Sequence, residues 1–192
     1  MTLPDYVLAI DPAGKQENSA FCLSCLTTLN TTIMYEPLLT GIFPTIERGG
    51  IPQPDTWPFT KFRRQLKKKY PGTIDLVIER YVGRGHTGWI SEHIAFTMGA
   101  WAAVWNLGAV RCIMASQWKK PLTQFGEQYD YTSANPKYAN WWEDHYSYFY
   151  EADRIKRGDK HVQDACGIGY WYWGWELEVD CYPQPSDILT GD

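Results

Sequence analysis

The chain has 192 residues, of which 44% are hydrophobic and 21% are charged, a composition typical of a soluble globular protein. This length favours one domain over residues 1–180, followed by an acidic tail over residues 181–192. No apolar run reaches the roughly 18 residues that a membrane-spanning helix needs, and no basic region precedes the N-terminal apolar run as in a secretory signal. We therefore expect a cytoplasmic protein without a membrane partner, and the formal net charge of −4 argues at first against a nucleic-acid binder.

The N-terminal part of the chain predicts strands followed by a helix. Apolar or alternating runs indicate three strands, over residues 4–10, 19–26 and 31–35. Residues 36–56 are rich in Pro and Gly, so we expect a surface loop there. A helix is predicted from Pro58 to about Tyr70, with apolar residues on one face, basic residues on the other and Pro71-Gly72 at its end.

The rest of the chain alternates strands and helices. Strands are predicted over residues 74–78 and 110–114, with a helix over residues 90–106 between them. A further helix is expected from Pro136 to about residue 152, and the last helix begins near Asp159 or Lys160. This order of elements describes a mixed α/β sheet with helices on its faces.

Acidic residues stand at the ends of two predicted strands, and a histidine and another acid stand on the last helix. Asp11 follows the first predicted strand, and Glu79 follows the fourth. His161 and Asp164 lie three residues apart, so they project from one helical face. Oxygen and nitrogen ligands from separate elements are typical of a divalent-metal site, and two ions bridged by Asp11 suit phosphodiester hydrolysis. These four residues are therefore the candidate catalytic residues and metal ligands.

Each of these residues also has an ordinary structural explanation. An Asp that precedes a proline, as Asp11 does, often forms a turn. Glu79 next to Arg80 also fits a surface ion pair. The first turn of a helix suits an exposed His161 and an Asp164 that interacts with the helix dipole. The occurrence of all four ligands together, at strand ends and a helix start, favours the metal site.

The basic residues are clustered, which qualifies the argument from net charge. Residues 176–192 hold five of the 22 acidic residues and no Lys or Arg, so the rest of the chain carries 18 basic and 17 acidic side chains. Six bases fall within residues 61–69, and smaller groups occur at 119–120 and 156–160. One such run is also typical of a solvated helix surface, but three basic groups alongside a metal site favour a phosphate-binding face.

Three segments resemble the catalytic blocks of a nuclease family. These segments are Val7–Gly14, Leu76–Glu79 and His161–Ala165. They resemble the three catalytic blocks of RuvC-like Holliday junction resolvases, a family of the RNase H-like superfamily. The helix around Gly99 and the strand that leads into Ser116–Lys120 also look like that family. The resemblance covers residues 1–125 and 155–175, which is most of the chain.

The resemblance implies an RNase H-like mixed five-stranded sheet flanked by helices, in a homodimer that makes paired symmetric nicks across a four-way DNA junction. The implied cofactor is Mg²⁺ or Mn²⁺, with two ions per active site, in the cytoplasm of a bacterial or phage-infected host cell. Asp11, Glu79 and Asp164 map onto the family's catalytic acids, and His161 falls where many members have another Asp and some have His. A proton competes with a metal for a histidine near its ordinary pKa of about 6.5. We therefore expect activity to fall at mildly acidic pH and His161→Asp to flatten that loss.

The expected DNA-binding residues come from three parts of the sequence. They are Arg80, Tyr81 and Arg84 after the second acid, Lys119 and Lys120 after strand 110–114, and Arg63 and Lys67 on the basic helix. Tyr81 suits stacking on an opened base and equally suits packing under its loop. The Trp- and Tyr-rich segment 138–150 and the acidic tail indicate a viral or otherwise divergent branch, which leaves the preferred branched substrate open.

The helix over residues 90–106 is expected to form the dimer interface. Its small and aromatic residues include Ala95, Gly99, Trp101 and Ala103. These residues would let two copies approach closely, and packing within the core of one chain explains them equally well.

The sequence thus predicts a metal-dependent, structure-selective DNA endonuclease, and alternatives exist within and outside this class. A broader nuclease for flaps or forks would use the same site. A catalytically silent nucleic-acid-binding protein on the same fold is disfavoured because all the expected ligands are present. A phosphotransferase of the actin-like ATPase fold is also disfavoured, since that fold needs further glycine-rich phosphate loops and usually a much longer chain.

Overall fold

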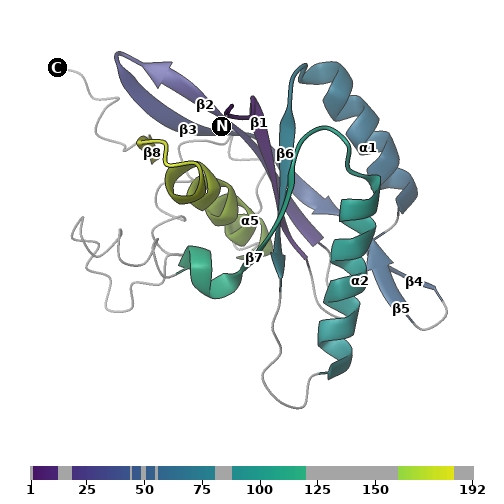
Figure 1. Ribbon diagram of the computed structural model, residues 1–192. Coiled ribbons are helices and arrows are strands. Elements are labelled where there is room, and N and C mark those ends of the chain that lie inside the picture. The colour runs from purple at the N-terminus through teal and green to yellow at the C-terminus, as the bar shows by residue number, and fades with distance from the viewer. Residues whose placement is uncertain are drawn as a thin grey trace.

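A computed structural model describes the protein over residues 2–12, 19–43, 45–48, 51–54, 56–80, 88–119 and 160–183 (Figure 1). The strands of this part of the chain are β1 (Tyr6–Asp11), β2 (Ser19–Leu29), β3 (Thr32–Phe43), β4 (Thr45–Arg48), β5 (Ile51–Pro54), β6 (Ile74–Arg80), β7 (Val110–Met114) and β8 (Cys181–Pro183). Its helices are α1 (Thr56–Lys69), α2 (Gly88–Val104) and α5 (Lys160–Trp171), with a short helical turn at 115–119. Helix α5 continues into the π-helical turn η1 (Tyr172–Glu176).

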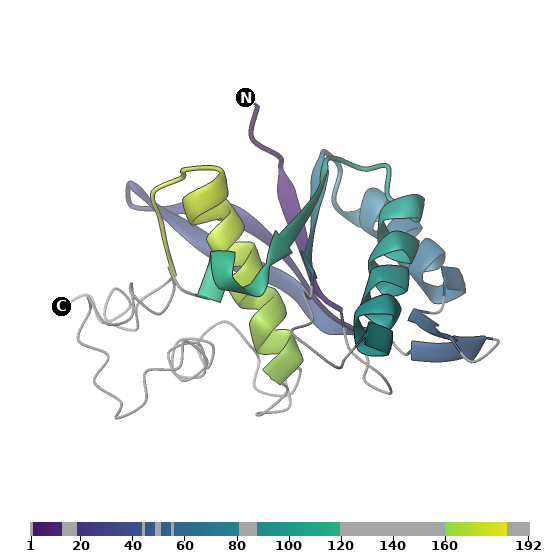
Figure 2. The same ribbon diagram turned by 60° about the horizontal axis from the view of Figure 1, so that its bottom comes forward.

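One mixed sheet with the strand order β7-β6-β1-β2-β3-β8 carries the fold. Strand β1 pairs in parallel with β6, which pairs in parallel with β7, and β2 runs antiparallel between β1 and β3. Helices α1 and α2 lie on one face of this sheet and α5 lies on the other (Figures 1 and 2). The expected mixed five-stranded sheet with flanking helices is therefore confirmed, and the short β8 adds a sixth strand beside β3.

The alternation of side chains along β1 divides the core into two layers. Val7 and Ala9 pack on the side of α5, whereas Leu8 and Ile10 pack on the side of α1 and α2. Strands β1 and β6 are apolar almost throughout because a central parallel pair is buried on both faces. A polar residue at the end of either strand is therefore held in place by packing from both sides.

Helix α5 lies directly against the sheet. Its residues Ala165, Cys166 and Ile168 are fully buried. A Cβ at Gly169 would lie 3.0 Å from the Tyr35 hydroxyl oxygen on β3, so a side chain here would require Tyr35 to shift and glycine suits this close approach. The close packing fixes the position of the first turns of α5 over the ends of the central strands.

The prediction of a surface loop over residues 36–56 is wrong. Strand β3 continues to Phe43, and the antiparallel pair of β4 and β5 follows it. Pro37 lies where the register between β2 and β3 shifts, and a proline is tolerated in a strand at such an irregularity. At Gly41 a Cβ would lie 2.9 Å from the ring of Phe21 on β2, so this glycine makes room for an aromatic ring rather than for a turn.

The other predicted elements are close to the observed ones. The helices expected over 58–70 and 90–106 are α1 and α2, and the last helix is α5, which begins at Lys160 as predicted. The helix expected from Pro136 lies outside the described residues. Strand β8 begins one residue beyond the expected end of the domain at residue 180. Within the described ranges, no helix combines the length and the apolar character needed to cross a membrane.

We expect Gly41→Ala to lower the free energy of unfolding by about 1–3 kcal/mol, because the added methyl group overpacks the strand against the Phe21 ring. That ring has little room to move, since the rings of Phe43 and Phe62 lie 5.1 and 4.8 Å from it. Gly174→Ala is the matched control, because its Cβ would meet no atom within 4 Å and its stability should not fall. Urea unfolding measures both variants, and equal losses would contradict the packing argument.

Candidate active site

The ends of β1 and β6 bring two acids side by side. The strands are parallel, with Ile10 opposite Ile78, so Asp11 and Glu79 occupy the next position on each strand. Adjacent strands lie about 4.8 Å apart, and the alternation of side chains places both acids on the face that α5 covers. Glu79 lies within β6 rather than after it, because the strand continues to Arg80.

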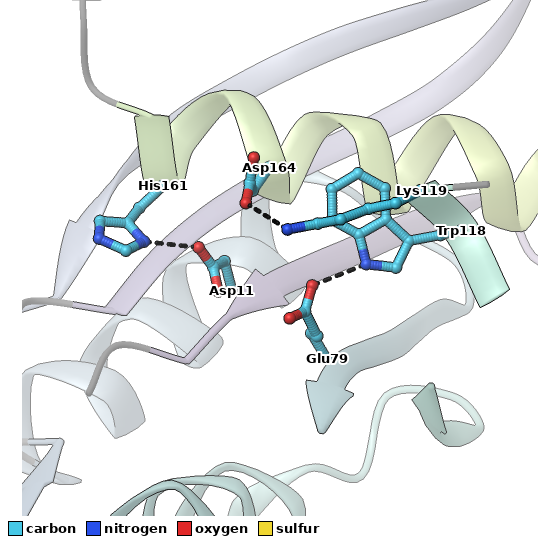
Figure 3. Close-up of polar contacts among 6 residues, drawn as sticks. All are labelled: Asp11, Glu79, Trp118, Lys119, His161 and Asp164. Carbon is cyan, nitrogen blue, oxygen red and sulfur yellow. Dashed lines mark hydrogen bonds and ion pairs between the residues drawn. The ribbon is translucent and has the colours of Figure 1, made fainter. Parts of the chain in front are cut away.

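The first turns of α5 supply the other two predicted residues. His161 Nδ1 lies 2.7 Å from Asp11 Oδ2, and Lys119 Nζ lies 3.1 Å from Asp164 Oδ2. Figure 3 shows these side chains converging between α5 and the strand ends. Asp11 and Asp164 are only 7% and 5% exposed, so their charges are largely held out of water.

A short helical turn after β7 adds a side chain from a third strand end. Residues 115–119 form this turn, and Gln117 Oε1 accepts a hydrogen bond of 2.7 Å from the Met114 backbone N–H, which holds the turn against the strand. Trp118 is fully buried, and its indole N–H donates to Glu79 Oε2 over 2.7 Å (Figure 3).

Trp118 is the residue of this site that sequence reasoning missed. A tryptophan offers one N–H donor and no ligand atom, so a search for acids and histidines passes over it. Its signal is positional, because it closely follows a strand that pairs in parallel with β6. The carboxyl ends of parallel neighbours meet at one edge of a sheet, which is where Asp11 and Glu79 lie.

The surroundings of the site disfavour the ionised forms of two of its carboxylates. Burial, followed by the nearby charge of Asp11, raises the pKa of Glu79 to about 7. Burial also raises the pKa of Asp11, although the hydrogen bond and charge of His161 oppose that shift. Both shifts mean that the protein disfavours the ionised carboxylates. A cation among these oxygens would favour the ionised forms.

The chemistry of the donor set fits a divalent cation. Three carboxylates and one imidazole are ligands that Mg²⁺ and Mn²⁺ accept, and a cation beside Glu79 would favour the ionised carboxylate that burial and Asp11 disfavour. Among the residues that the structure describes, no three carboxylate, imidazole or thiol groups lie close enough together to share an ion. Protein donors contact the carboxylates instead, so binding a shared ion requires Asp11 and Asp164 to exchange these partners for the metal.

The predicted DNA-binding residues that the structure describes do not gather in one place. Arg63 donates to the Val104 carbonyl oxygen and, over 3.1 Å, to Asn106 Oδ1, so it ties α1 to the end of α2. Lys67 lies in the last turn of α1, shortly before the start of β6, and that strand rises about 16 Å before it reaches Glu79. Both bases also belong to the helix layer on the opposite face of the sheet from α5 (Figure 1).

One other predicted base does lie at the acidic site. Lys119 contacts Asp164, so its charge is part of the candidate active site as well as of the predicted DNA-binding set. Arg80 is exposed and directly follows Glu79 on β6, so the alternation of side chains puts it on the opposite face of the sheet from Glu79. The remaining predicted residues, Tyr81, Arg84 and Lys120, lie outside the described residues.

The strand order, the mixed strand directions and the two helix layers define an RNase H-like fold. Two solved structures share this arrangement over nearly the whole chain, and both are of RuvC from Thermus thermophilus. The structure of RuvC alone has a TM-score of 0.61 at 12% sequence identity, with 90% of this chain and 96% of that chain covered. The structure of RuvC in complex with Holliday junction substrate has a TM-score of 0.57 at 12% identity, with 93% and 99% covered.

The sequence itself matches no protein-family model and no curated protein. At 12% identity the likeness to RuvC shows the fold alone, and that fold is RuvC-like. The viral or divergent origin expected from the sequence stays a prediction.

We expect Glu79→Gln to stabilise the metal-free protein at neutral and alkaline pH. The unfolded chain protonates this carboxylate near pH 4.5 and the folded protein near pH 7, so the folded state binds the proton more tightly and stability falls as the pH rises through this interval. Above pH 7 the ionised side chain costs on the order of 2–3 kcal/mol. Gln avoids this cost and still accepts the Trp118 hydrogen bond.

Urea unfolding in the presence of a chelator, between about pH 4.5 and pH 8, measures the difference between wild type and Glu79→Gln. The difference should vanish at the acidic end and be largest at the alkaline end. A difference that does not change with pH would refute the raised pKa of Glu79.

Proposed function

We propose that this protein is a metal-dependent, structure-selective DNA endonuclease that resolves four-way (Holliday) junctions by paired symmetric nicks. The observation that carries the proposal is the convergence of Asp11, Glu79 and Asp164 at the ends of two parallel strands and the start of α5 (Figure 3). The RuvC-like fold supports it, since one of the similar structures is RuvC in complex with Holliday junction substrate.

The cofactor in this proposal is Mg²⁺ or Mn²⁺, with two ions per active site. The ligands are Asp11, Glu79, His161 and Asp164. Ions bound by such ligands make a water more acidic and stabilise the charge on the leaving oxygen of a phosphodiester. The chain orients the ligands, because β1 and β6 hold the two neighbouring carboxylates in register and α5 places His161 next to Asp11.

Lys119 is the described cation best placed to meet the DNA backbone at the site. Its ammonium lies beside Asp164, and its side chain is 35% exposed, so a phosphate can reach it. Arg80 is exposed at the end of β6, on the opposite face of the sheet from Glu79, and would contact DNA beside the site rather than within it. Further proposed contacts are the residues close behind these two in the sequence, Tyr81, Arg84 and Lys120. The positions of Arg63 and Lys67 on α1 give no support to a role at the cleaved phosphate.

We expect the protein to nick a labelled synthetic four-way junction symmetrically near the crossover in Mg²⁺ or Mn²⁺, and to leave a linear duplex uncut. Asp11→Asn should lower the cleavage rate by more than about 100-fold. Residues that only orient metal ligands already contribute about 10–100-fold to metal affinity or activity, and Asp11 is itself a proposed ligand. Asp180→Asn is the matched control, since it makes the same change on an exposed acid and should cleave like wild type.

Other outcomes of this cleavage assay separate the alternative functions. Preferential cutting of flaps or forks, lost in Asp11→Asn, would keep the nuclease and replace its substrate. Tight junction binding without cleavage in either metal would leave a nucleic-acid-binding protein on a nuclease fold. Equal rates for Asp11→Asn and wild type would remove this site from the reaction.

The proposed reaction needs two active sites, because paired nicks fall on two strands and one chain supplies one site. We propose that two copies meet through the outer face of α2, whose exposed small or apolar residues are Ala95, Phe96, Gly99 and Ala103. Phe96 is 51% exposed, and its spacing of three and seven residues from Gly99 and Ala103 puts it on one helix face with these small residues. Trp101, which we expected on this face, is instead fully buried against Phe43 and Phe59 and belongs to the core.

We expect light scattering at micromolar concentration to show two copies for the wild type and one for Phe96→Glu, because a charge cannot enter an apolar contact unpaired. Ile42→Glu is the matched control, since Ile42 is 49% exposed on β3, and it should stay dimeric. Phe96→Glu should also convert paired nicks into single nicks. A monomeric wild type would contradict coordinated double nicking.

A further inference from the structure

Trp118 links the turn after β7 to a proposed metal ligand. Its Nε1–H donates to Glu79 Oε2 over 2.7 Å. An indole N–H donates a hydrogen bond and never accepts one, so Glu79 Oε2 is the acceptor. The hydrogen bond is charge-assisted when Glu79 is ionised. Figure 3 shows the Glu79 carboxylate between the indole and Asp11. The bond therefore restrains one carboxylate oxygen and leaves the other on the side of the site.

The same indole also supports Lys119. The ammonium of Lys119 lies 4.9 Å from the centroid of the Trp118 ring, within the range of a cation–π contact. It also lies 3.1 Å from Asp164 Oδ2. One buried side chain thus contacts an acid of the site through its edge and a base of the site through its face.

A comparison with Trp101 separates this arrangement from ordinary core packing. Trp101 is equally buried, in the other core layer, and its Nε1 has no hydrogen-bond partner among the described residues. The fold therefore accommodates a fully buried indole N–H without an acceptor in one layer. Burial alone does not account for the acceptor of Trp118, which is a proposed metal ligand.

We propose that Trp118 is a positioning residue that orients Glu79 for divalent-metal binding and keeps the Lys119 ammonium at the site. The inference rests on the proposed nuclease function, in which Glu79 is a metal ligand. Groups that orient metal ligands from behind typically contribute about 10–100-fold to metal affinity or activity. Trp118 acts in this way through the edge of its ring, without touching the metal or the DNA.

The test compares Trp118→Phe with Trp101→Phe, which remove the same atoms from the two core layers. Mn²⁺ binding without DNA, measured by isothermal titration calorimetry, should weaken about 10–100-fold in Trp118→Phe and stay at the wild-type level in Trp101→Phe. Glu79→Ala, which leaves the indole without this acceptor, should also bind Mn²⁺ more weakly, and adding Trp118→Phe to it should weaken binding less than Trp118→Phe does alone. The Mn²⁺ concentration that gives half-maximal junction cleavage should rise in parallel.

The outcomes distinguish this inference from the function on which it rests. Equal Mn²⁺ affinity in the two Trp variants would overturn the role of Trp118 and leave the nuclease standing. A wild type that binds no Mn²⁺ would overturn both. In case Trp118→Phe does not fold, the indole signals of ¹⁵N-tryptophan-labelled wild type provide the measurement. Mg²⁺ should shift the Trp118 indole signal in the wild type but not in Glu79→Gln, and an unmoved signal would overturn the inference.

Discussion

The parallel pairing of β1 with β6 is the constraint on which the site depends. The register of this pair puts Asp11 and Glu79 at neighbouring positions, and packing on both faces of the two strands leaves these side chains little freedom. Helix α5 then covers the face to which both acids point and adds His161 and Asp164 from its first turns. The contacts that stabilise the core are therefore the same contacts that hold the carboxylates out of water.

This arrangement trades stability for chemistry. His161, Lys119 and the indole of Trp118 each stabilise one carboxylate, yet burial still raises the pKa of Asp11 and of Glu79. Ionised Glu79 therefore lowers the stability of the metal-free protein, which is the cost that an active site commonly imposes on its fold. In the proposed function, a divalent cation would remove this cost by favouring the ionised carboxylates. The proposed metal function thus accounts for a charge arrangement that folding alone disfavours.

Some parts of this structure could be predicted from the sequence because their signals are local. A buried parallel pair is apolar along its whole length, and a helix puts residues at i and i+3 on one face, so β1, β6 and the four proposed ligands were recognisable. Strand β3 beyond residue 36 was not, because Pro37 serves a register shift and Gly41 makes room for a ring on the neighbouring strand. A basic run shows where charge lies along the chain but not on which face of the sheet it falls. The sequence therefore did not reveal that Lys67 lies far from the acids. The position of Trp118 at the site could not be predicted without knowing that β7 is the neighbour of β6.

In the proposed nuclease, metal binding and DNA binding depend on one another. Buried carboxylates repel a phosphate, and Lys119 neutralises only part of their charge. The bases in the last turn of α1 lie near the opposite end of the central strands and cannot neutralise the rest. A phosphate therefore enters the site favourably only together with divalent cations. Selection of a four-way junction over linear duplex would then come from a branched shape that reaches two sites at once.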